Sequence, residues 1–364
     1  MGIPVIDKAT IKHADMDRLA DYRDYLRHNP KLAYLFLELT DCCNLACRHC
    51  GSSCDPRNST FLDVDLTIET LRSVAEDFDA EKIMVCFTGG EPLVHPRFFD
   101  IARSAVDCGF SWGMTTNGTL IDRHTAERLM DARMGSITVS IDGLEESHDW
   151  LRRSPGSYQR AVDGVRNLVE LGIDVQVTTV VHKGNMEELE QVYTNMAELG
   201  TASWRLVNIE PIGRAMAMRD LWLSQEEFGR LLSFIRDKRF DANVIMDVCF
   251  GCSHYLGTDF EREVRDNYFI CGSGIYVGSV LCNGDIYSCL DIERRPELVQ
   301  GNVAIDRFGD VWKNRFQQFR ENRTAKCGTC SECPDNRYCA GGSGHTWNYD
   351  KNEPTICLRK GFGT

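Results

Sequence analysis

Three features that are scarce or missing in the sequence limit what the protein can be. No run of about 18 consecutive apolar residues occurs, so we expect no segment that spans a membrane. The first residues are too polar for the apolar core of a secretory signal, and we therefore expect a cytoplasmic protein. Lysine and arginine number 41 against 54 aspartate and glutamate residues, and the net charge of -13 argues against a nucleic-acid partner.

Cysteine is absent from residues 109–248, although the chain has 17 cysteines in total. Five of them lie in residues 42–54 and eight in residues 271–357. A secreted disulfide-rich protein would combine a signal sequence with a small core, and neither is visible here. Thiols at this density in a reducing compartment usually serve metal or redox chemistry. The distribution therefore predicts two separate metal-bearing regions.

Strand-like and helix-like runs alternate after a polar, helical N-terminal extension at 1–30. The expected strands are Ala33–Leu39, Lys82–Phe87, Ser111–Thr116, Ser136–Ile141, Val175–Val181 and Ser203–Asn208, and the expected helices are one capped by Asp65, Pro96–Cys108, Asp122–Arg133, Ser157–Leu171, one around Met186–Met196 and Gln225–Arg236. Six β–α units in series predict a parallel sheet with helices outside. The stretch that contains these six units is short for a complete eight-fold barrel. We predict an α/β fold with a partial (β/α)6 TIM-like barrel at 31–240 and a small cysteine-rich domain at 241–364.

The first cysteine group directly follows the first predicted strand, in the sequence TDCCNLACRHCGSSC. Cys43, Cys47 and Cys50 lie on one loop at the carboxyl end of that strand, where barrel enzymes place their active sites. A [4Fe–4S] cluster normally takes four cysteines, so three leave one iron open to another ligand. A zinc site or unligated thiols are the alternatives at this point. We expect Cys42 to be a core thiol and Cys54 to be an exposed one.

Four further motifs follow predicted strands in order along the chain. They are Thr88-Gly89-Gly90-Glu91-Pro92, Thr115-Thr116-Asn117-Gly118, Ser140-Ile141-Asp142-Gly143 and Glu210-Pro211-Ile212-Gly213-Arg214. With the cysteine triplet, they resemble the radical S-adenosylmethionine (SAM) superfamily, in particular its members with a C-terminal SPASM domain. The resemblance extends from about residue 33 to 357. It implies that the open iron chelates SAM and that one electron cleaves SAM to a 5′-deoxyadenosyl radical.

The resemblance also implies roles for individual residues around the cofactor. The residues Gly89, Gly90, Glu91 and Pro92 would hold the methionine ammonium group. Thr115, Asn117, Ser140 and Asp142 would also bind the cofactor, with Ser140 as a ribose or carboxylate contact. Either Arg152 or Arg153 would pair with the methionine carboxylate. For each of these positions, ordinary turn chemistry is the alternative.

The second cysteine region is similar to the SPASM pattern at seven of its eight positions. Its residues are Cys271, Cys289, Cys330, Cys333, Cys339 and Cys357, with Gly284 before Cys289 and Ser343 where a further cysteine is expected. The resemblance implies two auxiliary [4Fe–4S] clusters, the distal one on Cys330, Cys333, Cys339 and Cys357. The other would use Cys271 and Cys289, with Cys327, Cys282 or Cys252 in place of Ser343. A zinc site on Cys327, Cys330, Cys333 and Cys339, in a protein without radical chemistry, is the alternative.

The resemblance favours a peptide or protein substrate that is crosslinked or oxidised at a side chain, since an auxiliary cluster can accept the second electron. The alternatives are a small-molecule or cofactor-precursor substrate and an anaerobic sulfatase-maturase-like enzyme. The latter has an aspartate directly after the cysteine, whereas here Leu290 follows Cys289 and Asp291 comes next, as a candidate catalytic base. Expected partners are a flavodoxin- or ferredoxin-type electron donor and, because 1–30 is too short for a leader-binding domain, a separate leader-peptide-binding protein.

Overall fold

The computed structural model describes residues 8–242, 244–251, 254–258, 260–357 and 361–362. Cys252, one of the expected substitute ligands, lies outside the described residues. Within the described part, no helix is long and apolar enough to cross a membrane.

A ten-stranded sheet forms the centre of the described chain, in the order β10-β9-β8-β1-β2-β3-β4-β5-β6-β7. Its strands are β1 (Tyr34–Glu38), β2 (Met84–Thr88), β3 (Ser111–Thr116), β4 (Ser136–Ser140), β5 (Val175–Val181), β6 (Ser203–Asn208), β7 (Asp247–Phe250), β8 (Val277–Val280), β9 (Asp285–Tyr287) and β10 (Gly301–Asn302). Neighbours from β8 through β1 to β7 are parallel, and β9 and β10 are added antiparallel. Two small sheets pair β11 (Trp347–Asn348) with β12 (Glu353–Pro354) and β13 (Ile356–Cys357) with β14 (Gly361–Phe362).

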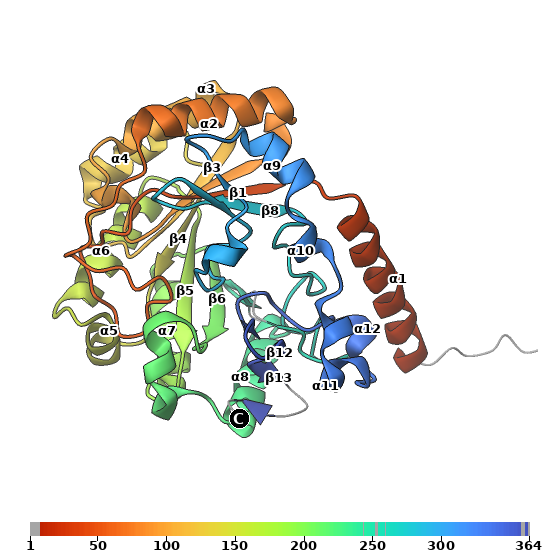
Figure 1. Ribbon diagram of the computed structural model, residues 1–364. Coiled ribbons are helices and arrows are strands. Elements are labelled where there is room, and N and C mark those ends of the chain that lie inside the picture. Colours follow the sequence, from red (N-terminus) through yellow and green to blue (C-terminus); the bar gives the residue numbers. More distant parts are fainter. Residues whose placement is uncertain (1–7, 243, 252–253, 259, 358–360, 363–364) are drawn as a thin grey trace, which may run out of the picture.

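The helices of the barrel cover the outer face of this curved sheet (Figure 1). The α-helices are α1 (Lys8–His28), α2 (Val64–Asp77), α3 (Phe98–Asp107), α4 (Arg123–Asp131), α5 (Glu145–Arg152), α6 (Ser157–Val169), α7 (Leu189–Glu198), α8 (Gln225–Arg239), α9 (Phe308–Asn314), α10 (Gln317–Arg320), α11 (Gly328–Ser331) and α12 (Asn336–Cys339). Short 3₁₀ turns lie at Ala80–Lys82, Pro92–Val94, Met186–Glu188, Gly213–Ala217, Arg219–Leu221, Pro296–Leu298 and Arg323–Lys326. The predicted partial barrel is confirmed.

Alternating burial along each strand separates an outer, helix-packed face from an inner face. On β6, Trp204 and Leu206 are fully buried, and the Trp204 ring packs on Tyr193 of α7 and Phe234 of α8. On β2, the Phe87 ring packs on Phe98 of α3. Apolar residues at every second position thus fix which side chains point inward, because successive side chains of a strand face opposite sides.

The structure differs from the predicted elements in the cap of α2, in the extent of the sheet and in α5, a helix that was not predicted. Asp63, rather than Asp65, caps α2, because its carboxylate accepts a hydrogen bond from the Leu66 backbone nitrogen at 2.9 Å. The sheet also continues past residue 240: β7 pairs with β6, and β8 to β10 extend it from β1. The domain boundary near residue 240 stays a prediction.

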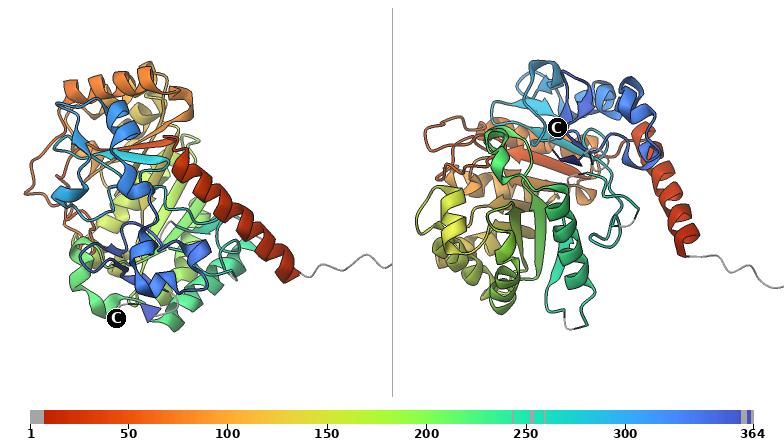
Figure 2. Two further views of the ribbon diagram at one scale, coloured as in Figure 1. Left: turned by 45° about the vertical axis from the view of Figure 1, so that its right-hand side comes forward. Right: turned by 90° about the horizontal axis from the view of Figure 1, so that it is seen from below.

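The N-terminal helix α1 docks on the cysteine-rich C-terminal region, beside α12 (Figure 2). The Arg23 side chain donates hydrogen bonds to the carbonyl oxygens of Arg337 and Tyr338 at 2.8 and 2.9 Å. Arg337 in turn pairs with Asp17 and Asp21 on α1. These contacts satisfy carbonyls at the end of α12 and hold the two ends of the chain together.

Candidate active site

The structure brings the three predicted cluster ligands together in the loop after β1. Cys43 and Cys47 are each 7% exposed, and with Leu45, Cys50 and Cys54 they form one apolar cluster. Burial raises the pKa of the Cys43 thiol to about 12 and also raises that of Cys47. A buried thiolate is therefore disfavoured unless a cation binds it, which suits a metal site that displaces the thiol protons.

Cys54 is buried, and the expectation that it is an exposed thiol is wrong. It is 2% exposed, and its thiol is hydrogen-bonded to Cys50. This hydrogen bond is the main reason why the pKa of Cys50 falls to about 6. Cys54 therefore supports the thiolate of a predicted ligand. The spacing of four residues between the two thiols was visible in the sequence, but their contact depends on how the loop folds.

The Gly89-Gly90 turn after β2 packs directly against the cysteine loop. The Gly90 nitrogen donates to the Thr40 carbonyl at 2.7 Å, and the Glu91 nitrogen donates to the Cys42 carbonyl at 3.1 Å. A Cβ atom at Gly90 would lie 2.0 Å from the Cys42 carbonyl oxygen. Glycine is thus required here by close backbone approach. The turn therefore fixes the position of the loop that carries the three thiols.

The Glu91 carboxylate is fully buried and joins the ends of β2 and β3. It accepts hydrogen bonds from the Thr116 hydroxyl at 2.8 Å and the Asn117 backbone nitrogen at 2.9 Å. Burial raises the pKa of Glu91, and these donors partly offset the rise. The Asn117 amide reaches the cysteine loop and donates to the Asn44 side chain at 2.8 Å. Among the other predicted contacts of this region, Pro92 is buried and Thr115 is exposed.

Asp142, after β4, forms a buried ion pair with Arg152 beside the cysteine loop. Arg152 Nε lies 2.6 Å from Asp142 Oδ2, and Arg152 Nη1 lies 3.6 Å from Cys47 Sγ. Burial opposes ionisation of Asp142, yet the Arg152 charge, with smaller contributions from neighbouring histidines, lowers its pKa to about 2. Arg153 is exposed, and Ser140 is half-buried at the end of β4. Of the two predicted arginines, the structure therefore places Arg152 at the thiols.

Three histidines, His49, His148 and His182, surround this ion pair or lie close to it. One ring nitrogen of each is buried without a hydrogen-bond partner among the described residues: His49 Nδ1, His148 Nε2 and His182 Nε2. Burial lowers the pKa of His49 to about 4 and that of His148 to about 4. Neutral rings with unsatisfied nitrogens beside the thiol loop fit a site that closes around a polar bound group.

The Pro211–Arg214 turn after β6 also contacts the cysteine loop, through hydrogen bonds to its backbone. Arg214 donates from Nε to the Cys47 carbonyl at 2.7 Å and from Nη2 to the Cys54 carbonyl at 2.9 Å. Its backbone nitrogen donates to the Cys50 carbonyl at 3.0 Å. The role of this motif in the structure is therefore to hold the backbone of the cysteine loop by hydrogen bonds.

The C-terminal cysteines gather in two places. The thiol of Cys330 interacts with those of Cys327, Cys339 and Cys357, and Cys339 also interacts with Cys333. Burial raises the pKa of Cys330 to about 12 and that of Cys339 to about 11. Cys327 therefore lies with the predicted distal ligands.

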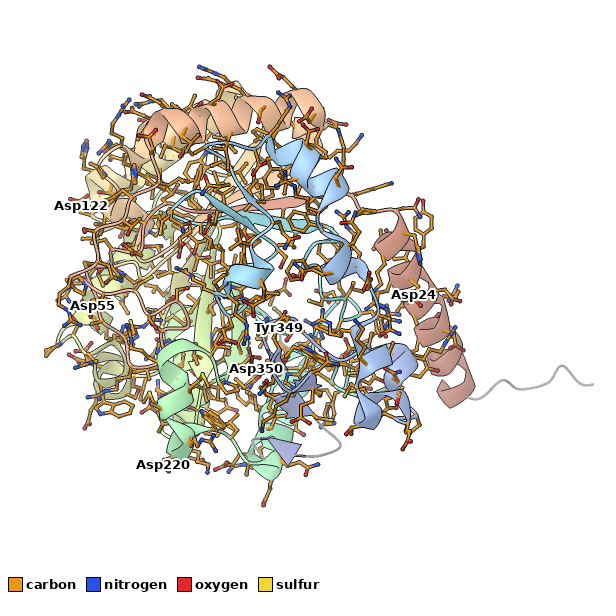
Figure 3. The ribbon with its side chains drawn as sticks, in the orientation of Figure 1. Asp24, Asp55, Asp122, Asp220, Tyr349 and Asp350 are labelled. Atoms are coloured by element: carbon orange, nitrogen blue, oxygen red, sulfur yellow. The ribbon has the colours of Figure 1, made fainter. Side chains whose placement is uncertain are left out.

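Cys271 and Cys289 form the other place, where the charges of both act on Tyr349, which lies near the middle of the molecule (Figure 3). Burial raises the pKa of the Cys271 thiol, but the Arg323 charge and backbone N–H groups lower it overall. Arg323 Nη1 and Arg27 Nε are buried without a hydrogen-bond partner in the described part of the chain. Orphaned cationic groups beside thiols fit an anionic iron–sulfur cluster. Cys282 lies elsewhere, beside Glu38 and Arg294.

A buried ion pair joins the barrel to the Cys271 site. His345 Nε2 lies 2.7 Å from Glu210 Oε2, with side-chain exposures of 7% and 11%. Burial disfavours the charged imidazole, but the Glu210 carboxylate raises the pKa of His345 to about 9. Ser343 Oγ lies 3.3 Å from the same ring nitrogen. Asp291 is exposed, yet close enough for its charge to act on His345.

The donor sets fit iron–sulfur clusters: three thiols in a loop that leaves room for a further ligand, and thiol groups with compensating cations in the C-terminal region. When bound, the cluster and SAM supply the 5′-deoxyadenosyl radical. The chain holds the loop by backbone hydrogen bonds, closes it with buried side chains and places Arg152 beside its thiols. In the described residues, no three His, Cys, Asp or Glu side chains converge closely enough to hold a single metal ion.

Comparison with known proteins agrees with this arrangement. The Radical SAM superfamily matches residues 37–195, and an iron–sulfur cluster-binding SPASM domain matches residues 271–334. An AdoMet-dependent heme synthase of Nitratidesulfovibrio vulgaris is 26% identical over 91% of this chain and 94% of its own length. The mycofactocin maturase MftC of Mycobacterium tuberculosis is 28% identical over 84% of this chain and 76% of its own.

Solved structures show the same fold at lower identity. SuiB of Streptococcus suis bound to SAM has a TM-score of 0.69 and 17% identity, over 93% of this chain and 79% of that one. The enzyme anSMEcpe with bound AdoMet has a TM-score of 0.67 and 17% identity, over 85% and 88%. The cofactors of the protein are [4Fe–4S] clusters and SAM. Residues 37–195 thus form a radical SAM domain, and residues 271–334 form a SPASM iron–sulfur cluster-binding domain.

Proposed function

We propose that the protein is an oxidising radical SAM enzyme that crosslinks a peptide or protein or oxidises one of its side chains. A hydrogen atom leaves the substrate to the 5′-deoxyadenosyl radical, and one electron then leaves the substrate radical to an auxiliary cluster, with a proton released. Asp291, exposed beside the Cys271 site, is the candidate base.

The observation that carries this proposal is a continuous set of contacts from the first thiol site to the second. The Pro211–Arg214 turn is hydrogen-bonded to the backbone of the cysteine loop. Glu210, which directly precedes this turn, forms an ion pair with His345 beside Cys271. A substrate held at the barrel mouth would thus lie between the radical source and an electron acceptor. That arrangement suits a two-electron oxidation.

The substrate class is supported by the relatives. Similarity to the mycofactocin maturase favours a peptide. A second candidate, a tetrapyrrole, is supported by the heme synthases, which match almost the whole chain. An anaerobic sulfatase-maturase-like activity has less support, because Leu290 stands directly after Cys289. A flavodoxin- or ferredoxin-type donor, a separate leader-binding protein and a cytoplasmic location complete the proposal.

The test is anaerobic reconstitution followed by incubation with reductant, SAM and either candidate peptides or iron coproporphyrin III. We expect about 8–12 irons per chain, release of 5′-deoxyadenosine and a substrate mass lower by two units. A Cys47→Ala variant should release none. Zinc without iron, or no 5′-deoxyadenosine from the wild type, would refute radical chemistry. Modification of the tetrapyrrole alone would replace the peptide with the second candidate.

A further inference from the structure

Arg205 projects from β6 into the interior of the barrel. The residues on either side of it, Trp204 and Leu206, are fully buried against the outer helices, so the arginine lies on the opposite, concave face. Gly251 lies beside its stem, because a Cβ atom there would be in ordinary contact, at 3.4 Å, with both Cγ and Cδ of Arg205. The described chain thus places a long cationic side chain inside the barrel.

Cys86 on β2 belongs to the same concave face, because its neighbours Val85 and Phe87 are fully buried on the opposite side of the sheet. Three strands separate β2 from β6 in the sheet, which is roughly 19 Å along the sheet at the usual spacing. Burial raises the pKa of the Cys86 thiol to about 12, and the Arg205 charge opposes the rise. Arg205 and Cys86 therefore share the concave face, and the arginine charge acts across it.

Arg205 has a neutral partner but no counter-charge. Its Nε donates to the Thr178 hydroxyl at 3.1 Å, and it forms no ion pair with a carboxylate of the described residues. Its terminal nitrogens have no hydrogen-bond partner in that same part of the chain. The guanidinium is half-buried, and its terminal nitrogens are not among the buried atoms without a partner, so they stay accessible to an anion that enters the barrel. Its fork of donors matches a carboxylate.

The register of the sheet places Arg205 on one inner row with a predicted cofactor contact. Ser140 pairs with Thr178, and Thr178 pairs with Arg205. Two strand spacings, about 10 Å, therefore separate the backbone of Arg205 from that of Ser140. A group bound at the guanidinium would lie near the cofactor whose ribose or carboxylate Ser140 is expected to contact.

We propose that Arg205 binds a carboxylate of the substrate inside the barrel and so orients the substrate toward the radical source. The proposal rests on the proposed function, because it places the substrate of that reaction. A peptide carboxylate and a tetrapyrrole propionate share this chemistry. Thr178 acts as a positioning residue, since its hydroxyl holds the guanidinium Nε.

Binding of acids and their neutral derivatives tests the proposal. The probes are a short peptide with a free C-terminal carboxylate against its amide, and iron coproporphyrin III against its tetramethyl ester. Binding to the reconstituted protein with SAM is measured anaerobically by equilibrium dialysis. We expect wild type to bind the acid of one pair at least tenfold more tightly than its neutral form. Arg205→Gln should lose this preference, Arg205→Lys should keep part of it, and Arg103→Gln, an exposed control on α3, should match wild type.

The outcomes separate the proposal from its alternatives. Whichever acid is preferred identifies the source of the carboxylate. Equal binding of acid and neutral forms, binding of neither acid, or an unchanged preference in Arg205→Gln would overturn the role of Arg205. Loss of the SAM-induced change in the cluster's EPR spectrum in Arg205→Gln would assign the residue to the cofactor and also overturn it. Failure of the proposed function appears separately, as absence of 5′-deoxyadenosine from wild type.

Discussion

Replacing Gly90 with alanine would push a methyl group into the loop that carries the cluster ligands. The new Cβ atom would lie 2.0 Å from the Cys42 carbonyl oxygen and 3.0 Å from Cys43 Cβ. Ordinary contact begins near 3.4 Å, so the loop must retreat by roughly 1.4 Å. Metal–ligand distances tolerate only about 0.2 Å. The backbone at Gly90 does not need a positive φ, so the effect is purely steric.

We expect Gly90→Ala to fold with its auxiliary sites intact but to lose the first cluster. Iron content after anaerobic reconstitution should fall by about four atoms per chain, the SAM-dependent EPR signal should vanish, and 5′-deoxyadenosine release should drop to background. Gly229→Ala is the matched control, because its new Cβ on α8 meets nothing within 4 Å. That variant should keep full iron and gain about 0.5–1 kcal/mol of stability. A Gly90→Ala protein with full iron and SAM cleavage would refute the reasoning.

Three further predictions follow from the buried charges. Glu91→Gln removes an acceptor from a buried backbone N–H and should cost about 1–3 kcal/mol in denaturant unfolding; an unchanged midpoint would contradict this. Asp142 has a pKa of about 2 when folded against 3.8 normally, so its contribution is complete above about pH 4 and lost as the pH falls toward 2. Asp142→Asn should abolish this loss of stability at low pH. Because it also leaves the buried Arg152 charge without a partner, it should cost roughly 3–5 kcal/mol of unfolding free energy at pH 7. Denaturant unfolding at several pH values measures both effects. Arg323→Gln should lower the reduction potential of the cluster at Cys271, by EPR titration, and no shift would show that this cation does not act on it.

The sequence alone was enough to predict the barrel and to place Cys43, Cys47 and Cys50 together on one loop after the first strand. Strand and helix periodicity are properties of contiguous segments, so six β–α units could be predicted from the pattern of apolar residues before any contact was known. The Cys43–Cys50 spacing likewise fixes three thiols on one loop. The Gly-Gly-Glu-Pro turn could be located, but its steric contact with Cys42 could not.

Tertiary structure decided everything that joins distant segments. The hydrogen bond between Arg205 and Thr178, the pair between Glu210 and His345 and the docking of α1 all depend on how distant segments are brought together. Cys54 is a local case with the same cause, because its burial follows from how the loop packs rather than from its spacing. Local periodicity specifies which face of a strand points inward, whereas the side chains that meet across the interior are set by the closure of the whole sheet.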